Sequence, residues 1–298
     1  MDEQDGSACW LCGTLTSVLT REHTPPRSAY NSGRVILQRP SDQAIELGYL
    51  AWKEDSAYLH GHFRRSLCER CNSLGGRAFV PAYSDFVHQV AQKVSTRIPL
   101  TSIEVEAVRN PQLILRQILL QLVTSNGPKF VEANNWIRPF LLTRKPCRLP
   151  DNVHLYIFAT QNGGMRSTGL TGQILLDKET FRVFSEFTHW PLGTILSFSE
   201  LVDEPLLCIT DWSEIPFRSK NRLTLKLPVN PTVSPCPLDF RDDLGILLDM
   251  NKPGRLRMDE QLALRIMSEM QTEVNRRSGD DSSKRILTGR RLRPAMSD

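Results

Sequence analysis

Long apolar segments are missing from this sequence of 298 residues. No segment approaches the roughly 18 consecutive apolar residues that a membrane-spanning helix requires. The first residues, MDEQDGSA, are acidic and show neither the basic nor the apolar part of a secretory signal. We therefore expect a soluble, cytoplasmic protein without a membrane partner.

Compositional extremes are missing as well. Hydrophobic residues make up 40% of the chain and charged residues 23%, which is typical of a folded globular protein and excludes a disordered or fibrous one. A chain of this length exceeds one ordinary domain, so two compact units are expected. The glycine-rich segment QNGGMRSTGLTGQ (161–173) lacks the GK[ST] of a phosphate-binding P-loop, and we interpret it as a turn.

The charge of the chain is concentrated at its end. From Arg276 to Asp298 seven Lys and Arg face three Asp, which gives +4, so the total of +4 leaves residues 1–275 neutral. A basic tail fits contact with nucleic-acid phosphates. It fits a solvated, disordered terminus slightly better when charge is considered alone.

The cysteines fall into two groups. Four of them form the pairs CWLC and CERC, at Cys9, Cys12, Cys68 and Cys71. In a chain without an export signal, two such pairs favour metal binding over disulfides, with a redox Cys-x-x-Cys pair as the weaker alternative. Four thiolates are the tetrahedral ligand set of structural zinc. The three single cysteines are expected to be small buried residues: Cys147, Cys208 and Cys236.

Between the two pairs lies LTREHTPPRS (19–28), in which Glu22 directly precedes His23 and a Pro-Pro follows. The order CWLCG, LTREHTPPRS and SLCERCNSLGG resembles the HNH (ββα-metal) endonuclease superfamily in its four-cysteine, treble-clef-like form. The resemblance covers residues 9–76. It implies an α+β fold with a zinc-stapled N-terminal ββα-metal domain, followed by helices and a mainly antiparallel β-rich domain.

The resemblance also implies roles for individual residues. His23 would act as the general base, because a neutral imidazole can accept a proton from water at neutral pH. Glu22 and Asn72 would ligate a catalytic divalent ion, Mg²⁺ or else Mn²⁺ or Ni²⁺, since hard cations prefer oxygen ligands. The zinc would only hold the fold. The implied activity is hydrolysis of phosphodiester bonds in DNA, with RNA left open.

The sequence departs from the family pattern at two positions, one of which is the acidic residue before the histidine, where this chain has Glu22 rather than Asp. The middle Asn of the HNH triplet lies shortly before the second cysteine pair, where this chain has Phe63. His60 and His62 precede this position, and we expect His62 to be an accessory catalytic residue, with strand histidines that face solvent as the alternative. Arg64 and Arg65 are natural phosphate contacts, although a solvated edge strand shows the same residues.

A second hypothesis stays open. Glu22 can be a surface charge, His23 a turn residue and Asn72 a helix cap. The N-terminal domain would then be a non-catalytic treble-clef zinc module that binds nucleic acid or a protein partner.

The rest of the chain is predicted from its periodicity. We expect the HNH-like domain over 1–80, a helical connecting region over 81–145, a β-rich module over 146–245 and a C-terminal helix with a basic tail over 246–298. One helix is expected over 81–96 with Ser84 as its N-cap, and a second, buried one after Asn110-Pro111. Its narrow polar stripe consists of Arg116, Gln117, Gln121 and Thr124.

Six strands are predicted between residues 150 and 230, where apolar segments are separated by Gly, Pro, Asn and Asp. In the last of them Leu223, Leu225 and Leu227 alternate with polar residues, as in a half-buried antiparallel strand. The order of these segments is similar to that of bacterial HNH-like proteins, which implies a role in phage defence or in a mobile element. The C-terminal region can serve a homodimer or an activating partner.

Overall fold

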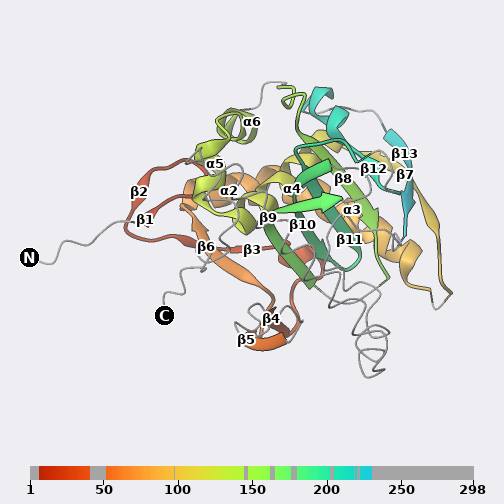
Figure 1. Ribbon diagram of the computed structural model, residues 1–298, viewed down its shortest axis with the longest axis horizontal. Helices are drawn as coiled ribbons and strands as arrows, with labels where there is room; N and C mark the ends of the chain where they lie inside the picture. Colours follow the sequence, from red (N-terminus) through yellow and green to blue (C-terminus); the bar gives the residue numbers. More distant parts are fainter. Residues whose placement is uncertain are drawn as a thin grey trace, which may run out of the picture. The chain divides into compact units, whose positions relative to one another are not determined.

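The computed structural model describes residues 7–40, 52–96, 98–143, 147–161, 165–175, 180–201, 205–217, 219 and 222–229. These residues form helices together with antiparallel sheets, so the chain has an α+β fold (Figure 1). The predicted C-terminal helix, the basic tail and Cys236 lie outside the described residues.

The chain divides into two compact units. The main unit comprises residues 1–36, 57–170 and 184–242, and it contains both cysteine pairs. The second unit comprises residues 37–56, 171–183 and 243–298. Of the second unit the structure describes most of the paired strands β4 (Val35–Pro40) and β5 (Trp52–Tyr58) and the adjoining parts of two long strands. The domain boundaries expected from the sequence stay predictions.

The N-terminal part of the main unit consists of short strands and one helix. β1 (Ser7–Ala8) pairs with β2 (Leu15–Thr16) around the first cysteine pair. β3 (Thr20–His23) pairs antiparallel with β6 (Phe63–Leu67), and α2 (Glu69–Ala78) follows β6 directly. β3 ends before Pro25-Pro26 because proline has no N–H to donate to a strand partner, and the 3-10 turn η1 (Arg27–Ala29) follows.

Helices α3 to α6 cover the middle of the chain: α3 (Val80–Val94), α4 (Pro111–Asn126), α5 (Pro128–Ala133) and α6 (Ile137–Leu142). The helix expected after Asn110 is confirmed, with Pro111 in its first turn and Gly127 at its end. The predicted N-cap of α3 is wrong. Ser84 lies inside this helix, and its hydroxyl is 2.6 Å from that of Ser28.

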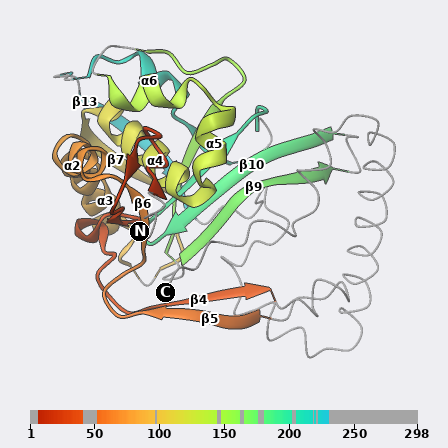
Figure 2. The same cartoon turned by 90° about the vertical axis from the view of Figure 1, so that its left-hand side faces the viewer.

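The β-rich part is a five-stranded sheet with the order β12-β8-β11-β10-β9. Its strands are β8 (His154–Ala159), β9 (Met165–Leu175), β10 (Thr180–His189), β11 (Leu192–Ser197) and β12 (Leu207–Cys208). Figure 2 shows the long strands β9 and β10 side by side. The interpretation of residues 161–173 as a turn is wrong from Met165 onward, because these residues belong to β9.

A separate antiparallel pair joins β7 (Ser102–Arg109) to β13 (Arg222–Pro228). In β13 the burial alternates as expected, with Leu225 and Leu227 buried and Thr224 and Lys226 exposed. β7 falls within the region predicted to be helical, so that region contains a strand that the sequence analysis did not predict.

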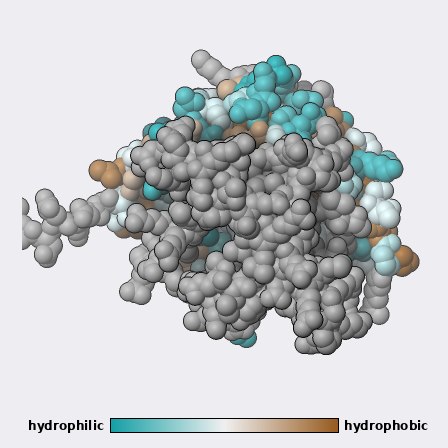
Figure 3. All heavy atoms as spheres, viewed as in Figure 1, coloured by the Kyte–Doolittle hydropathy of each residue, from teal (hydrophilic) through white to brown (hydrophobic). Residues whose placement is uncertain are grey.

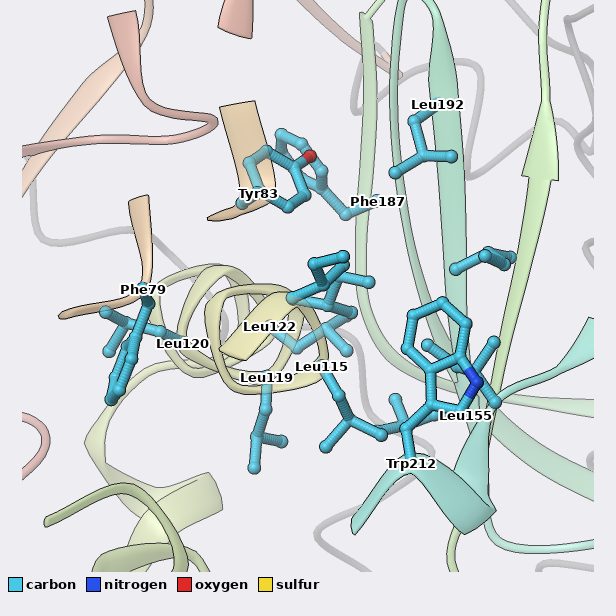
Figure 4. Packing of buried hydrophobic residues seen from close by; sticks show 14 of the residues in the cluster. Phe79, Tyr83, Leu115, Leu119, Leu120, Leu122, Leu155, Phe187, Leu192 and Trp212 are labelled. Carbon is cyan, nitrogen blue, oxygen red and sulfur yellow. The ribbon is translucent and has the colours of Figure 1, made fainter. Parts of the chain in front are cut away.

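The core of the main unit is built around α4. Figure 4 shows Phe79 and Leu120 on one side of this helix, and Leu155 and Trp212 on the other. The burial predicted for this helix is confirmed, and its polar stripe is buried together with the apolar face. Arg116 illustrates how such burial is tolerated: its guanidinium lies between the rings of Phe140 and Phe217 and donates to the carbonyl oxygen of Thr143 at 2.6 Å.

On the face in Figure 3, hydrophilic side chains gather along the upper edge, and hydrophobic ones are scattered at the sides. Among the described helices, none combines the length and the apolar character that a membrane crossing requires.

The single cysteines are less buried than expected. Cys147 is half-buried and Cys208 is exposed. The expectation is wrong for Cys208 because it lies in β12, a two-residue strand at the edge of the sheet, where one side chain faces outward.

Candidate functional site

The four paired cysteines meet in one cluster. Their sulfur atoms all lie within 4.8 Å of one another, and the Sγ atoms of Cys12 and Cys68 are 3.8 Å apart. A tetrahedral zinc site with Zn–S bonds of about 2.3 Å places its sulfurs about 3.8 Å apart. The cluster therefore fits a zinc ion without rearrangement of the backbone.

Local structure explains how two distant pairs come together. The first pair is in a tight turn, in which the Gly13 N–H donates to the Cys9 carbonyl at 2.8 Å while Gly13 has a left-handed φ of 78°. In the second pair, Cys68 is the N-cap of α2 and Cys71 lies in its first turn. A hydrogen bond of 2.9 Å from the Trp10 N–H to the Ser66 carbonyl joins the two segments.

The charges of the cluster also favour a cation. The pKa of Cys9 is lowered to about 4, mainly because Cys71 hydrogen-bonds to its sulfur. The pKa of Cys71 is raised, because it keeps the proton that it shares with Cys9 and because a second buried thiolate would lie beside the first. Several adjacent thiolates are stable together only around a positive ion.

A pocket of about 140 Å³ lies between β3, the start of η1, α2 and the first residue of α3. Its lining residues are Arg21, Glu22, His23, Pro26, Arg27, Asn72, Gly76 and Val80. Three residues predicted from the sequence as catalytic, Glu22, His23 and Asn72, are thus brought to one place. The two cysteine pairs hold the segments that carry His23 and Asn72.

Asn72 connects α2 to β3. Its side-chain NH₂ donates to the Thr20 hydroxyl at 2.8 Å and to the Arg21 carbonyl at 3.1 Å. Both amide hydrogens are used in this way, so the orientation of the carboxamide is fixed. Its carbonyl oxygen is the side-chain atom that these two bonds leave over, and an amide oxygen can act as an acceptor or as a ligand of a hard cation.

His23 ends β3 at the pocket. Burial lowers the pKa of its imidazole, and the positive charges of Arg27 and Arg21 lower it further. The ring is therefore neutral at pH 7. Its Nδ1 is buried and has no hydrogen-bond partner among the residues that the structure describes, while the ring packs at a centre-to-centre distance of 5.7 Å against that of Phe63.

Glu22 is buried, with only 7% of its surface exposed. Burial raises the pKa of its carboxyl to about 7. Neither an ion pair nor a hydrogen bond links its side chain to another residue in the described part of the chain. A buried carboxylate without a partner is costly, and a bound cation is one way to stabilise it.

Other predicted site residues lie elsewhere. His62 is buried and does not line the pocket; its Nδ1 is 3.2 Å from the Thr24 carbonyl, and burial lowers its pKa to about 4. Arg64 donates to the Thr124 carbonyl on α4 at 3.2 Å. Arg65 and His60 are exposed outside the pocket lining.

No family model, curated protein or solved structure matches this chain.

Two arginines of the pocket were missed by the sequence analysis. Arg21 and Arg27 flank the Glu-His pair, and both are exposed. The guanidinium of Arg21 lies 4.9 Å from the centre of the Phe63 ring, which orients it along β6. The alternation in TREH gave a signal, since Arg21 and His23 are two residues apart and point to the same face of a strand.

Asn31 was also missed. Its side-chain NH₂ donates to the carbonyls of Pro25 at 2.6 Å and His62 at 2.8 Å, and its oxygen accepts from the His62 N–H at 2.7 Å. Asn31 therefore holds the turn after His23 against the start of β6. The family pattern has an asparagine where this chain has Phe63, whereas the asparagine that fixes this turn comes from the loop after η1.

Proposed function

We propose that the main unit is a metal-dependent endonuclease of the HNH type, which hydrolyses phosphodiester bonds in DNA. The observation that carries the proposal is the pocket itself. It combines a neutral imidazole whose Nδ1 has no hydrogen-bond partner among the described residues, two side chains with oxygen atoms suited to a metal, and two exposed arginines. The four-cysteine cluster joins the segments that carry them, a strand pair and a helix.

The donor set fits a divalent ion of the Mg²⁺ class. Glu22 would supply a carboxylate that has no partner among the described residues, and Asn72 a fixed carbonyl oxygen; such hard oxygen donors suit Mg²⁺ or Mn²⁺. When bound, the ion supplies positive charge that stabilises the transition state and the leaving oxygen. Its binding also explains why Glu22 is retained in a buried position.

The remaining chemistry belongs to side chains of the chain. His23 accepts a proton from the attacking water, since its lowered pKa keeps the imidazole neutral. Arg21 and Arg27 bind the phosphate oxygens, and their positive charge compensates the charge that develops on the phosphate. Zinc at the four cysteines takes no part in the reaction. Its role is to hold α2 against β3.

The non-catalytic zinc module remains the second candidate. It is favoured by the donors of Asn72, which are both used to connect α2 to β3, as a structural residue would use them. In that case the two arginines bind phosphate without cleavage. The role in phage defence or in a mobile element is part of the proposal and depends on the family resemblance.

The deciding experiment is His23→Ala in a plasmid-nicking assay with Mg²⁺ or Mn²⁺. We expect the variant to lose at least 100-fold in nicking rate, the lower end of the usual contribution of a general base, while zinc content and circular dichroism stay unchanged. His60→Ala is the matched control, because His60 is exposed and outside the pocket lining. Wild-type protein that nicks no DNA with any divalent ion would favour the binding module.

A further inference from the structure

We propose that Tyr30, His88 and Trp190 form a stacking site for an unpaired nucleobase, next to the catalytic pocket. This inference rests on the proposed function and specifies its substrate as single-stranded DNA, or DNA with an unpaired base near the cleaved bond. The three residues are called the aromatic site below: Tyr30 directly follows η1, His88 lies in α3 and Trp190 directly follows β10.

In the aromatic site, the ring of Tyr30 contacts the other two rings at the protein surface. The Tyr30 ring centre lies 5.2 Å from that of His88 and 4.7 Å from that of Trp190, both in edge-on arrangements. Tyr30 nevertheless stays 42% exposed, and His88 is exposed beside it. Aromatic side chains of this size are usually buried when packing is their only role.

The backbone presents Tyr30 rigidly. Tyr30 follows η1 with a φ of 67°, in the left-handed region that is uncommon for a bulky residue. The turn before it is fastened to α3 by two contacts. The Nε2 of His88 lies 2.7 Å from the Ser28 carbonyl, and the hydroxyls of Ser28 and Ser84 are 2.6 Å apart. A pre-positioned ring loses little freedom when a base stacks on it.

The same 3-10 turn links the aromatic site to the pocket. Arg27, which begins η1, lines the pocket, and Tyr30 follows three residues later. At about 2.0 Å per residue this separation is about 6 Å, comparable with one or two nucleotide steps of about 3.4 Å along a strand. A phosphate at Arg27 therefore places a neighbouring base within reach of Tyr30.

The chemistry selects an unpaired base. Every base has a π-face that stacks on an aromatic ring, and this stacking supports binding to single strands with little sequence preference. In an intact duplex the bases already stack on one another and do not offer a face. The aromatic site therefore predicts preference for single-stranded segments, loops or bulges over uninterrupted duplex.

The test measures binding separately from cleavage. In the full chain carrying His23→Ala, affinity is measured by fluorescence anisotropy for a labelled oligothymidylate, for an abasic strand of equal length and for a duplex. Stacking of one base corresponds to roughly a 5- to 150-fold change in affinity. We expect Tyr30→Ala to weaken binding of the oligothymidylate by that factor, with little change for the abasic strand and the duplex. Tyr30→Phe, which keeps the ring, should bind normally.

A second variant separates loss of the ring from damage to the turn. Tyr30→Gly removes the ring but suits the left-handed backbone, so it should fold normally and bind like Tyr30→Ala. Equal weakening for base-bearing and abasic strands, or no weakening at all, would overturn the aromatic site. If wild-type protein cuts no DNA and Tyr30→Ala still loses base-dependent binding, the nuclease proposal fails and the aromatic site stands.

Discussion

Glu22 shows, at the scale of one residue, a conflict between stability and function. Its pKa of about 7, against an ordinary value of 4.5, means that the folded chain holds the proton more tightly than the unfolded chain. Such a group stabilises the fold less and less as the pH rises from 4.5 to 7. A carboxylate that destabilises the protein at neutral pH is expected at a functional site, where the ligand compensates the cost.

Glu22→Gln should therefore stabilise the protein in the absence of added divalent ions. A pKa that rises from 4.5 to about 7 corresponds to a gain of up to about 3 kcal/mol at pH 8. At pH 4 the carboxyl is protonated in both states, so the gain should vanish. Urea unfolding at the two pH values measures it.

The exposed Glu132 provides the control, since Glu132→Gln should change the free energy of unfolding little at either pH. Isothermal titration with Mn²⁺ should show, in addition, that Glu22→Gln weakens binding of the ion. A variant that is less stable than wild type at pH 8 would mean that Glu22 has a stabilising partner.

Helices and strands of this fold were predictable where the pattern of apolar residues lies within one segment of the sequence. α4 and β13 show their periodicity within one segment, and the two cysteine pairs carry their spacing in the sequence itself. β7 was missed because its partner β13 is far away in the chain, with Ile103 opposite Leu227, and no local pattern shows that pairing. Ser84 was misread as a helix cap for a similar reason, because its hydroxyl contacts Ser28 rather than its own helix.

The packing of α2 against β3 should depend on zinc. Cys68→Ser removes one of four ligands, and zinc binding is coupled to folding. We expect the variant to lose the bound zinc and the cooperative folding of the N-terminal elements. Zinc is measured by mass spectrometry of metals, and folding by near-ultraviolet circular dichroism.

Cys208→Ser is the matched control, because Cys208 is an exposed cysteine away from the cluster. It should keep one zinc ion per chain. Full zinc content in Cys68→Ser would exclude the four-cysteine site.

In the sheet, β11 depends on a glycine to pack against β8. Gly193 lies opposite Phe158, whose buried ring covers it: a Cβ at this position would be 2.0 Å from the Phe158 Cζ. Gly193→Ala should cost roughly 1–3 kcal/mol of stability, the usual range for overpacking. Gly33→Ala meets no atom within 4 Å and should have little effect. Equal melting temperatures of the two variants would show that Phe158 moves aside freely.

At the scale of the whole main unit, the candidate nuclease elements share one core with the sheet. Cys9, Leu67 and Cys71 belong to the same hydrophobic cluster as α4 and the strand residues Leu155 and Phe187. This could not be read from the sequence, because the cluster contains residues more than a hundred positions apart, such as Cys9 and Leu155.

The C-terminal turn of α4 contacts both the N-terminal elements and the sheet. The Thr124 hydroxyl lies 3.0 Å from that of Thr24, next to the proposed base, while Asn126 accepts from the Leu170 N–H and donates to the Ser185 hydroxyl on the sheet. Two residues of one helical turn thus contact the segment that follows His23 and the two strands β9 and β10. A shift of these strands would move Thr24 and, through one peptide bond, His23, so mutations in the sheet are expected to change the proposed nicking activity without altering the pocket itself.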